Sequence, residues 1–235
     1  MSGDGGFTGR WVRAFARSVT ACEPELTALD QLSGDGDFGA NLRSGLAVCT
    51  AALDGAGRVS PGAPLRVLAT AFLDEVGGTS GPLFGLLFQE LAAAVDGPEP
   101  TARALALGAG RGLAAIRRVG EAAPGDKTLL DALHPAVLAL AAAPPSAPAG
   151  PALERAADAA WEGVRRTAGL PSRRGRASYL GDRARGVPDP GAAGVAVFLS
   201  SARGPVLALA PLLAAPAPPA APAVRPHRPA GRGLR

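Results

Sequence analysis

The chain has 235 residues, of which 47% are hydrophobic and 19% charged, so one sizeable core and one domain are expected. Its formal net charge of +4 arises from four arginines within residues 204–235, a stretch without acidic residues, so residues 1–203 are formally neutral. A neutral domain without a basic face argues against a nucleic-acid-binding protein.

The predicted secondary structure is helical throughout. Alternating β-branched and aromatic residues are rare, whereas Ala and Leu recur at helical spacing and prolines separate the helical stretches. We predict eight helices, near residues 7–22, 39–54, 64–76, 81–95, 100–120, 127–143, 151–169 and 190–202. Because most connections are short, neighbouring helices should run antiparallel. The sequence therefore predicts an all-α, eight-helix antiparallel up-and-down barrel or bundle, with Cys22 and Cys49 as buried free thiols.

Three carboxylates precede the second predicted helix, at Asp30, Asp35 and Asp37. They repel one another unless a cation neutralises them, and oxygen ligands without nearby Cys or His indicate Mg²⁺ or Ca²⁺. A Ca²⁺-sensing EF-hand loop needs Glu at its twelfth position, where Asn41 or Leu46 stands instead, so we reject that function. A solvated Asp-Gly-Asp turn remains the alternative to a metal site. The helix that follows would direct its free N–H groups at the metal site, as a phosphate site requires.

Three further connections are rich in Gly, Asp, Ser and Thr. In alternating antiparallel helices, every second connection lies at the same end of the bundle. The connections before the second, fourth, sixth and eighth predicted helices are residues 30–39, 77–81, 121–127 and 171–190, and these are the polar ones. The remaining connections carry plain Pro, Gly and Ala. The sequence therefore predicts a single site at one end of the bundle.

These motifs, spread over residues 7–203, resemble the L subunit of dihydroxyacetone kinase, which also occurs as a domain of ATP-dependent dihydroxyacetone kinases. The resemblance implies the same helical fold and a phosphotransferase with an alcohol acceptor. It implies that Asp30, Asp35 and Asp37 bind two Mg²⁺ ions that bridge the phosphates of ADP or ATP. It also implies nucleotide contacts from Phe38, Gly39, Ala40, Asn41, Thr79, Ser80, Gly120, Leu129, Arg176, Asp189, Pro190 and Gly191.

Several of these residues also have a purely structural interpretation. Phe38 departs from the His or Thr usual in the family, and its ring can pack over the base or within the bundle. Thr79 and Ser80 form a possible helix N-cap pair, and Leu129 is an ordinary core residue.

The segment around Lys127 and the start of the last helix have such alternatives as well. Asp126 could cap the sixth helix, and Lys127 and Asp131, one turn apart, could pair on its surface. Asp189, Pro190 and Gly191 form a good helix start, with Pro at the first helical position.

A substrate-holding histidine is missing from this pattern. The two histidines are His134, in an apolar helix, and His227, in the C-terminal stretch. In the family, dihydroxyacetone is held by a histidine of a separate K subunit or domain, so the resemblance implies a K-type partner and no catalytic residue here beyond the metal ligands. We expect recharging of the bound nucleotide by a phosphohistidine carrier protein, with exchange of ATP as the alternative, and a homodimer stays open. The rival functions are a non-catalytic nucleotide-sensing module and a related kinase for another substrate.

Residues 204–235 differ from the rest of the chain. They hold eight of the 23 prolines and end in a basic arm, so we divide the chain into a domain of residues 1–203 and an extension. Residues 207–213 could prolong the last helix, and we expect disorder from about residue 214. The N-terminus lacks the apolar core of a signal peptide, and the apolar run 205–215 is too short for a membrane span. We therefore expect a cytoplasmic protein without membrane contact.

Overall fold

The computed structural model describes residues 6–56, 60–95, 97, 99–174 and 185–214. Within these residues it contains nine α-helices and no strand, which confirms the predicted all-α class. The helices are α1 (Gly6–Ser33), α2 (Phe38–Gly55), α3 (Ala63–Glu75), α4 (Ser80–Ala94), α5 (Ala102–Gly120), α6 (Leu130–Ala141), α7 (Ala149–Thr167), α8 (Pro190–Ser200) and α9 (Ala210–Leu213).

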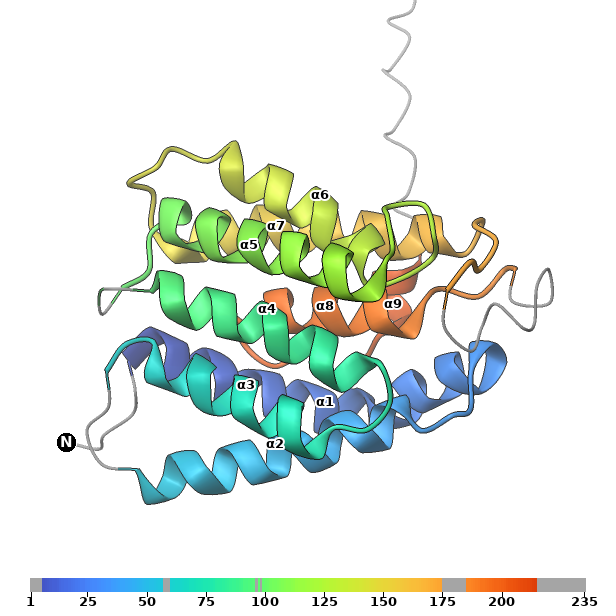
Figure 1. Ribbon diagram of the computed structural model, residues 1–235, viewed down its shortest axis with the longest axis horizontal. Helices are drawn as coiled ribbons and strands as arrows, with labels where there is room; N and C mark the ends of the chain where they lie inside the picture. The colour runs from blue at the N-terminus through green and yellow to red at the C-terminus, as the bar shows by residue number, and fades with distance from the viewer. Residues whose placement is uncertain (1–5, 57–59, 96, 98, 175–184, 215–235) are drawn as a thin grey trace, which may run out of the picture.

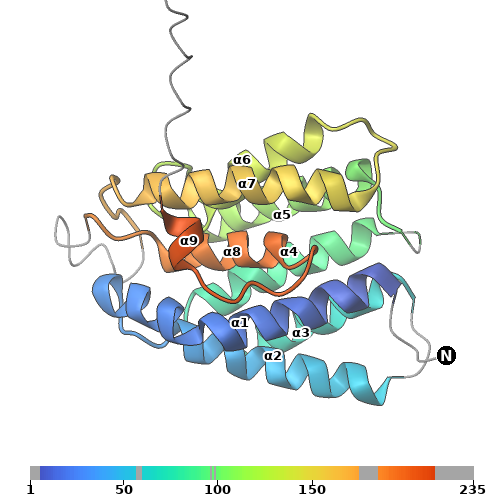
Figure 2. The ribbon, with the colours of Figure 1, turned by 180° about the vertical axis from the view of Figure 1, so that it is seen from behind.

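Successive helices pack side by side and reverse direction, and α8 returns to contact α1 as well as α6 and α7 (Figures 1 and 2). The connections before α2, α4, α6 and α8 therefore meet at one end, on the right in Figure 1. Helix α8 is apolar on every side, and its residues from Pro190 to Leu199 are buried. Its Phe198 ring lies 4.4 Å from that of Trp11 and 5.2 Å from that of Phe15, measured between centroids. A helix that is hydrophobic all round belongs in an interior, and the other helices enclose α8.

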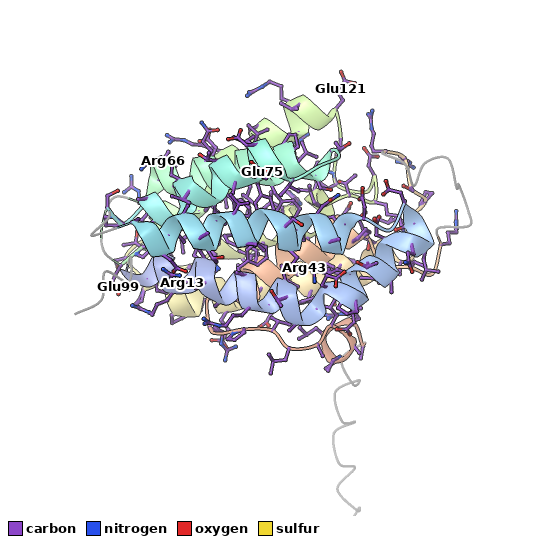
Figure 3. The ribbon with its side chains drawn as sticks, turned by 90° about the horizontal axis from the view of Figure 1, so that it is seen from below. Arg13, Arg43, Arg66, Glu75, Glu99 and Glu121 are labelled. Carbon is purple, nitrogen blue, oxygen red and sulfur yellow. The ribbon has the colours of Figure 1, made fainter. Side chains whose placement is uncertain are left out.

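The outer surface of α1–α3 carries charged side chains, as the view in Figure 3 shows. Arg13 of α1 pairs with Asp54 of α2 at 2.5 Å, and Arg43 of α2 lies 3.9 Å from Glu23 of α1. The predicted buried thiols lie on the opposite, inward side of these helices. Cys22 and Cys49 are both free and buried, and burial raises the pKa of the Cys49 thiol to about 12.

Helix α1 is longer than predicted, because it continues through Pro24 to Ser33. A proline inside a helix removes one backbone hydrogen bond and favours a break. Here the buried face continues at four-residue spacing through Cys22, Leu26 and Asp30, so packing outweighs that cost. The prediction of an end near residue 22 was wrong. Asp30 consequently lies on the last turn of a helix instead of in a loop.

The C-terminal stretch also differs from the prediction. Helix α8 ends at Ser200, and the chain turns back along α1 instead of prolonging the helix. The Val206 N–H donates to Ser18 Oγ at 2.8 Å, and the Leu209 N–H donates to the Glu25 carboxylate at 2.9 Å. Leu209 is fully buried. Residues 205–213 therefore pack on the bundle, beyond the expected boundary at residue 203.

None of the helices in the described residues combines the length and the apolarity needed to cross a bilayer.

Two glycines of α5 provide a test of how closely the helices pack. A Cβ on Gly108 would lie 2.8 Å from Leu91 Cα and 2.9 Å from the Glu90 carbonyl oxygen, whereas one on Gly110 would meet only Val137, at 3.9 Å. We expect Gly108→Ala to lower the free energy of unfolding by about 1–3 kcal/mol through overpacking. Gly110→Ala should raise it by roughly 0.5–1 kcal/mol, because alanine favours the helix.

Thermal unfolding followed by circular dichroism measures both changes. For a chain of this length, about 1 kcal/mol corresponds to a shift of roughly 2–4 °C in Tm. Equal shifts for the two variants would contradict the close α4–α5 contact at Gly108.

Candidate functional site

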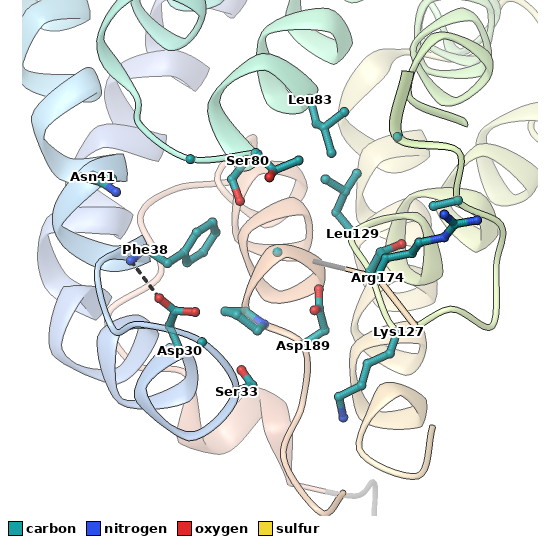
Figure 4. Close-up of a pocket in the computed structure, with 18 of the residues that line it drawn as sticks. Asp30, Ser33, Phe38, Asn41, Ser80, Leu83, Lys127, Leu129, Arg174 and Asp189 are labelled. Carbon is teal, nitrogen blue, oxygen red and sulfur yellow. Dashed lines mark hydrogen bonds between the residues drawn. The ribbon is translucent and has the colours of Figure 1, made fainter. Parts of the chain in front are cut away.

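A cavity of about 410 Å³ lies at the end of the bundle where α1 ends and α2, α4 and α8 begin (Figure 4). Residues from all four polar connections border it, although these connections are far apart in the sequence. The predicted site residues that line it are Asp30, Asp35, Asp37, Phe38, Asn41, Thr79, Ser80, Gly120, Leu129, Asp189, Pro190 and Gly191. Gly39 and Ala40 are not among its lining residues. Arg176 lies outside the described residues.

The three predicted metal ligands form one cluster. One carboxylate oxygen from each of Asp30, Asp35 and Asp37 lies within 4.8 Å of those of the other two. Asp30 is buried, with 8% of its surface exposed, and its Oδ2 accepts a hydrogen bond from the Phe38 N–H at 3.1 Å. Asp35 and Asp37 are exposed. This all-oxygen set suits Mg²⁺, which is typically bound by a few carboxylates and completes its coordination with water or phosphate.

Glycine is required in the loop that carries the exposed carboxylates. A Cβ on Gly34 would collide with the Asp30 carboxylate, and Gly36 has φ of 80°, a conformation that side chains disfavour. The loop can therefore turn tightly enough to bring Asp35 and Asp37 back over Asp30.

The hydrogen bonds at the start of α2 differ from what the predicted phosphate site requires. The Phe38 N–H is bonded to Asp30, and the Asn41 N–H donates to the Asp37 carbonyl oxygen at 2.9 Å. Two of the four N–H groups expected to hold phosphate therefore have acceptors within the protein. Gly39 packs against α1, since a Cβ there would lie 2.5 Å from Thr27 Oγ1. Close contact between α2 and α1 therefore requires glycine at position 39.

The Phe38 ring packs inward, which is the bundle alternative considered for this residue. Phe38 is 5% exposed, and its ring centroid lies 6.3 Å from that of Phe84. A Cβ on Gly194 of α8 would lie 3.0 Å from both rings. Phe38 thus borders the cavity but mainly joins α2 to α4 and α8.

The opposite wall combines hydroxyl groups and an apolar slot. Helix α4 begins at Ser80, and Thr79 stands in the N-cap position without a capping hydrogen bond from its side chain. Both residues line the cavity, so the simple N-cap interpretation does not describe Thr79. Apolar residues also line the cavity, and we call this set the apolar slot: Leu83, Ile116, Gly120, Ala122 and Leu129.

The segment before α6 is built differently from the prediction, because α6 begins at Leu130 and not near residue 127. Lys127 is only 2% exposed, and its Nζ donates to the Thr167 and Val187 carbonyl oxygens at 2.8 and 2.6 Å. Asp131 accepts hydrogen bonds from the Gly125 and Thr128 N–H groups at 2.5 and 2.8 Å. The expected surface pair of Lys127 and Asp131 was therefore wrong.

Asp126 does not cap α6 either. Its Oδ2 accepts from the Ala123 N–H at 2.9 Å, and its carboxylate lies 3.6 Å from Arg173 and 3.8 Å from Arg174. Arg174 lines the cavity, although no sequence motif singled it out. It belongs to a run of arginines that includes Arg173 and Arg176, and no spacing rule distinguishes them. Lys127 and Ser33 also line the cavity and were missed as site residues.

Asp189 caps α8 and borders the cavity. Its carboxylate accepts from the Ala192 N–H at 2.7 Å, and its own N–H donates to Thr167 Oγ1 at 2.8 Å. Burial raises the pKa of the Asp189 carboxyl to about 7, opposed by the Ala192 N–H and by Lys127 and reinforced by the carboxylates of Asp131 and Asp30. Asp189 is partly exposed as a residue, and it lines the cavity.

The raised pKa of Asp189 predicts that the free energy of unfolding decreases as pH rises. In metal-free buffer between about pH 4 and 7, the unfolded chain loses the Asp189 proton while the folded chain retains it, so stability falls as pH rises. Asp189→Asn keeps a cap acceptor but cannot ionise. We expect this variant to gain stability relative to the parent across that range, by up to about 4 kcal/mol at about 1.4 kcal/mol per pKa unit, with no further gain above about pH 7. Tm values of both proteins at each pH measure the difference, and a constant difference would contradict the raised pKa.

The protein is an all-α bundle with a cavity at one end, and a carboxylate cluster and an apolar slot line that cavity. A helical domain of this class can hold a cation beside an organic ligand. Residues 33–204 match the DAK2 domain family, and because this match covers most of the chain, the chain belongs to that family.

Two curated relatives illustrate the range of the family. The chain is 39% identical over 184 residues to L-erythrulose 1-kinase of Mycolicibacterium smegmatis, covering 76% of this chain and 32% of the relative. It is 34% identical over 186 residues to the ADP-binding subunit DhaL of PEP-dependent dihydroxyacetone kinase 1 of Listeria innocua, covering 78% of this chain and 87% of the relative. The chain thus spans about a third of the erythrulose kinase but most of the Listeria subunit.

The fold also matches solved structures. The native dihydroxyacetone kinase of C. freundii superposes with a TM-score of 0.62 at 27% identity, covering 83% of this chain and 33% of that one. The same kinase in complex with AMP-PNP and Mg²⁺ gives a TM-score of 0.61 at 25% identity, with 81% of this chain and 32% of that chain covered.

Proposed function

We propose that this chain is the nucleotide-binding part of a kinase that phosphorylates dihydroxyacetone or a closely related small ketose. The carboxylate cluster of Asp30, Asp35 and Asp37 beside the cavity carries the proposal. Family membership supports it, since the named relatives are kinases of dihydroxyacetone and erythrulose, one of them described as ADP-binding. The Listeria subunit is matched over 87% of its length and the erythrulose kinase over 32%, so the proposed L-type unit has relatives both as a subunit and as part of a longer kinase.

Different residues of the cavity would contact different parts of a nucleotide. The three aspartates would hold Mg²⁺, two ions by our proposal, which neutralises the charge of the phosphates when bound. The slot around Leu83, Gly120 and Leu129 offers apolar contact to an adenine ring. Thr79 and Ser80 offer hydroxyl groups to the same cavity, and Arg174 offers a cation. We also retain Arg176, Asp189, Pro190 and Gly191 as proposed nucleotide contacts.

The acceptor sugar requires a second protein in this proposal. His134 lies on α6 and is not among the residues that line the cavity. We therefore propose that a K-type subunit brings the bound ketose to the open mouth of the cavity. The nucleotide would then either be recharged in place by a phosphohistidine carrier or exchange with ATP. The Listeria relative, described as part of a PEP-dependent kinase, favours recharging in place.

A titration with Mg²⁺ and ADP tests the nucleotide site directly. A ligand at about 100 times its dissociation constant stabilises the folded state by about 2.7 kcal/mol, or roughly 5–10 °C in Tm for a chain of this size. We expect this shift with Mg²⁺ and ADP together, and at most a small shift with ADP in EDTA or with Mg²⁺ alone. Calorimetry at 25 °C gives the affinity. An equal response to ADP in EDTA would refute the role of the carboxylates.

A further inference from the structure

Resting on the proposed nucleotide site, we propose that Lys127 is a positioning residue that fixes one wall of the cavity by tying three chain segments together. It does so through hydrogen bonds to backbone carbonyl groups, not by touching the nucleotide. The three segments are the connection before α6, the end of α7 and the stretch that leads into α8.

The burial of Lys127 is unusual and is compensated by specific acceptors. Lysine is almost never fully buried unless it is paired, and a buried ammonium without hydrogen bonds is very costly. Lys127 is 2% exposed, and its Nζ reaches the carbonyl oxygens of Thr167 and Val187 at 2.8 and 2.6 Å. Lys127 is one of the residues that line the cavity, and its ammonium points away from Ser80 and Leu83 in Figure 4. This geometry is suited to holding the wall rather than a ligand.

The two acceptors lie at the two ends of the connection between α7 and α8. Thr167 is the last residue of α7, and Val187 stands two residues before Asp189, the N-cap of α8. Between them, the Gly186 N–H donates to the Ala168 carbonyl oxygen at 2.8 Å, which closes the base of the connection. One ammonium therefore joins chain positions that are 40 and 60 residues distant from it.

The chain segments that Lys127 joins lead directly into residues that line the cavity. Val187 leads directly to Asp189, Pro190 and Gly191, so a shift of its carbonyl group moves that part of the wall. Next to Lys127 in the sequence, the Asp126 carbonyl oxygen accepts a hydrogen bond from the Arg173 N–H at 3.1 Å. Arg173 adjoins Arg174, which also borders the cavity. Loss of the Lys127 bonds should therefore displace both flanks of the connection.

The charge of Lys127 supports the same role. The carboxylates of Asp189 and Asp131 lie near enough to raise its pKa, although desolvation lowers that pKa more strongly. A neutral side chain would leave two carbonyl groups and the Asp189 carboxylate without their cationic neighbour. Breaking such a buried arrangement by removing one partner is strongly destabilising, and here the damage should be local to this wall.

We would test the proposal with Lys127→Met, which keeps length and removes the donors, and Lys127→Arg, which keeps donors and charge. Gly108→Ala serves as a control that loses stability at the far end of the bundle. Two readouts are measured well below each Tm. One is amide hydrogen exchange of residues 168–174 and 185–189 in the ligand-free protein, and the other is the calorimetric Kd for ADP with Mg²⁺.

For Lys127→Met we expect faster exchange confined to those two stretches and at least a tenfold rise in Kd. Lys127→Arg should restore Kd to within about threefold, and Gly108→Ala should leave both readouts at parental values. Should Lys127→Met fail to fold, Lys127→Gln, which has a shorter and uncharged side chain, is judged by the same two criteria.

A parental Kd in the neutral variant, or a weaker Kd without local loosening, would overturn the positioning role. Loosening that spreads through α2–α4 would overturn it too, because Lys127 would then support the whole fold. If the parent protein itself does not bind ADP with Mg²⁺, the proposed function fails, but the exchange measurement still decides whether Lys127 ties the three segments.

Discussion

Asp35→Ala and Asp37→Ala are each expected to abolish the thermal shift produced by Mg²⁺ and ADP, while the ligand-free protein stays folded. Both side chains are exposed and belong to the carboxylate cluster with Asp30. Removing one of three neighbouring negative charges relieves repulsion in the metal-free state, which offsets the local interactions that the shortened side chain can no longer make. Without a full carboxylate set the cation is held weakly, so about 2.7 kcal/mol of ligand stabilisation at 100 times the parental Kd should disappear.

The third carboxylate should behave differently. Asp30 is buried on the last turn of α1 and accepts the Phe38 N–H, so it joins α1 to the start of α2. Asp30→Ala should therefore lose ligand binding and also lower the Tm of the ligand-free protein, because a buried N–H loses its acceptor. Asp158→Ala, an exposed aspartate on α7, is the matched control and should keep the full shift. A full shift in both the Asp35 and Asp37 variants would refute the metal site.

Helix counting predicts the location of the site because short connections alternate between the two ends of a bundle. The polar connections 30–39, 77–81, 121–127 and 171–190 each contribute residues to one cavity. This inference needs only the number of helices, which prolines and apolar spacing indicate well. It tolerates errors in helix bounds, such as the misplaced end of α1.

Details that depend on tertiary packing are not accessible from the pattern. Pro24 is a local signal for a helix end, but the buried face through Leu26 and Asp30 overrides it. Phe38 stands where the resemblance predicts His or Thr, and its contacts with Phe84 and Gly194 explain why its ring turns inward. Local propensity loses wherever burial supplies more free energy.

Lys127 illustrates a second kind of limit. The motif around it predicts a helix surface, where Lys and Asp one turn apart often pair. Its actual acceptors, the carbonyl groups of Thr167 and Val187, carry no side-chain signature in the sequence. The only hint is that a chain with 24 basic residues retains a single lysine at this position. The contact of Leu209 with the bundle likewise has no local signal in the sequence, because its partners on α1 are far away along the chain.

The isolated chain is expected not to phosphorylate dihydroxyacetone, even with Mg²⁺ and ATP at saturating concentration. The cavity supplies carboxylates, hydroxyl groups, an apolar slot and Arg174, all suited to a nucleotide. A three-carbon ketose has too few groups to be held in line by such a set, and positioning is most of what a phosphoryl-transfer enzyme contributes. Adding a K-type subunit with bound ketose should raise turnover by at least about a thousandfold.

The assay follows phosphorylated dihydroxyacetone in four mixtures: this chain alone, the K-type subunit alone, both together, and both with Asp37→Ala in place of the parent. Only the mixture of the two parental proteins should turn over, with ATP or with a phosphohistidine carrier as the phosphoryl source. Because Asp37 is exposed and its variant is expected to stay folded, its loss separates nucleotide chemistry from assembly. Robust turnover by this chain alone would mean that it holds the ketose itself, and the two-part proposal would be wrong. Tight binding of ADP with Mg²⁺ and no turnover in any mixture would instead favour the nucleotide-sensing function, since a sensor needs the carboxylates and the slot but no acceptor.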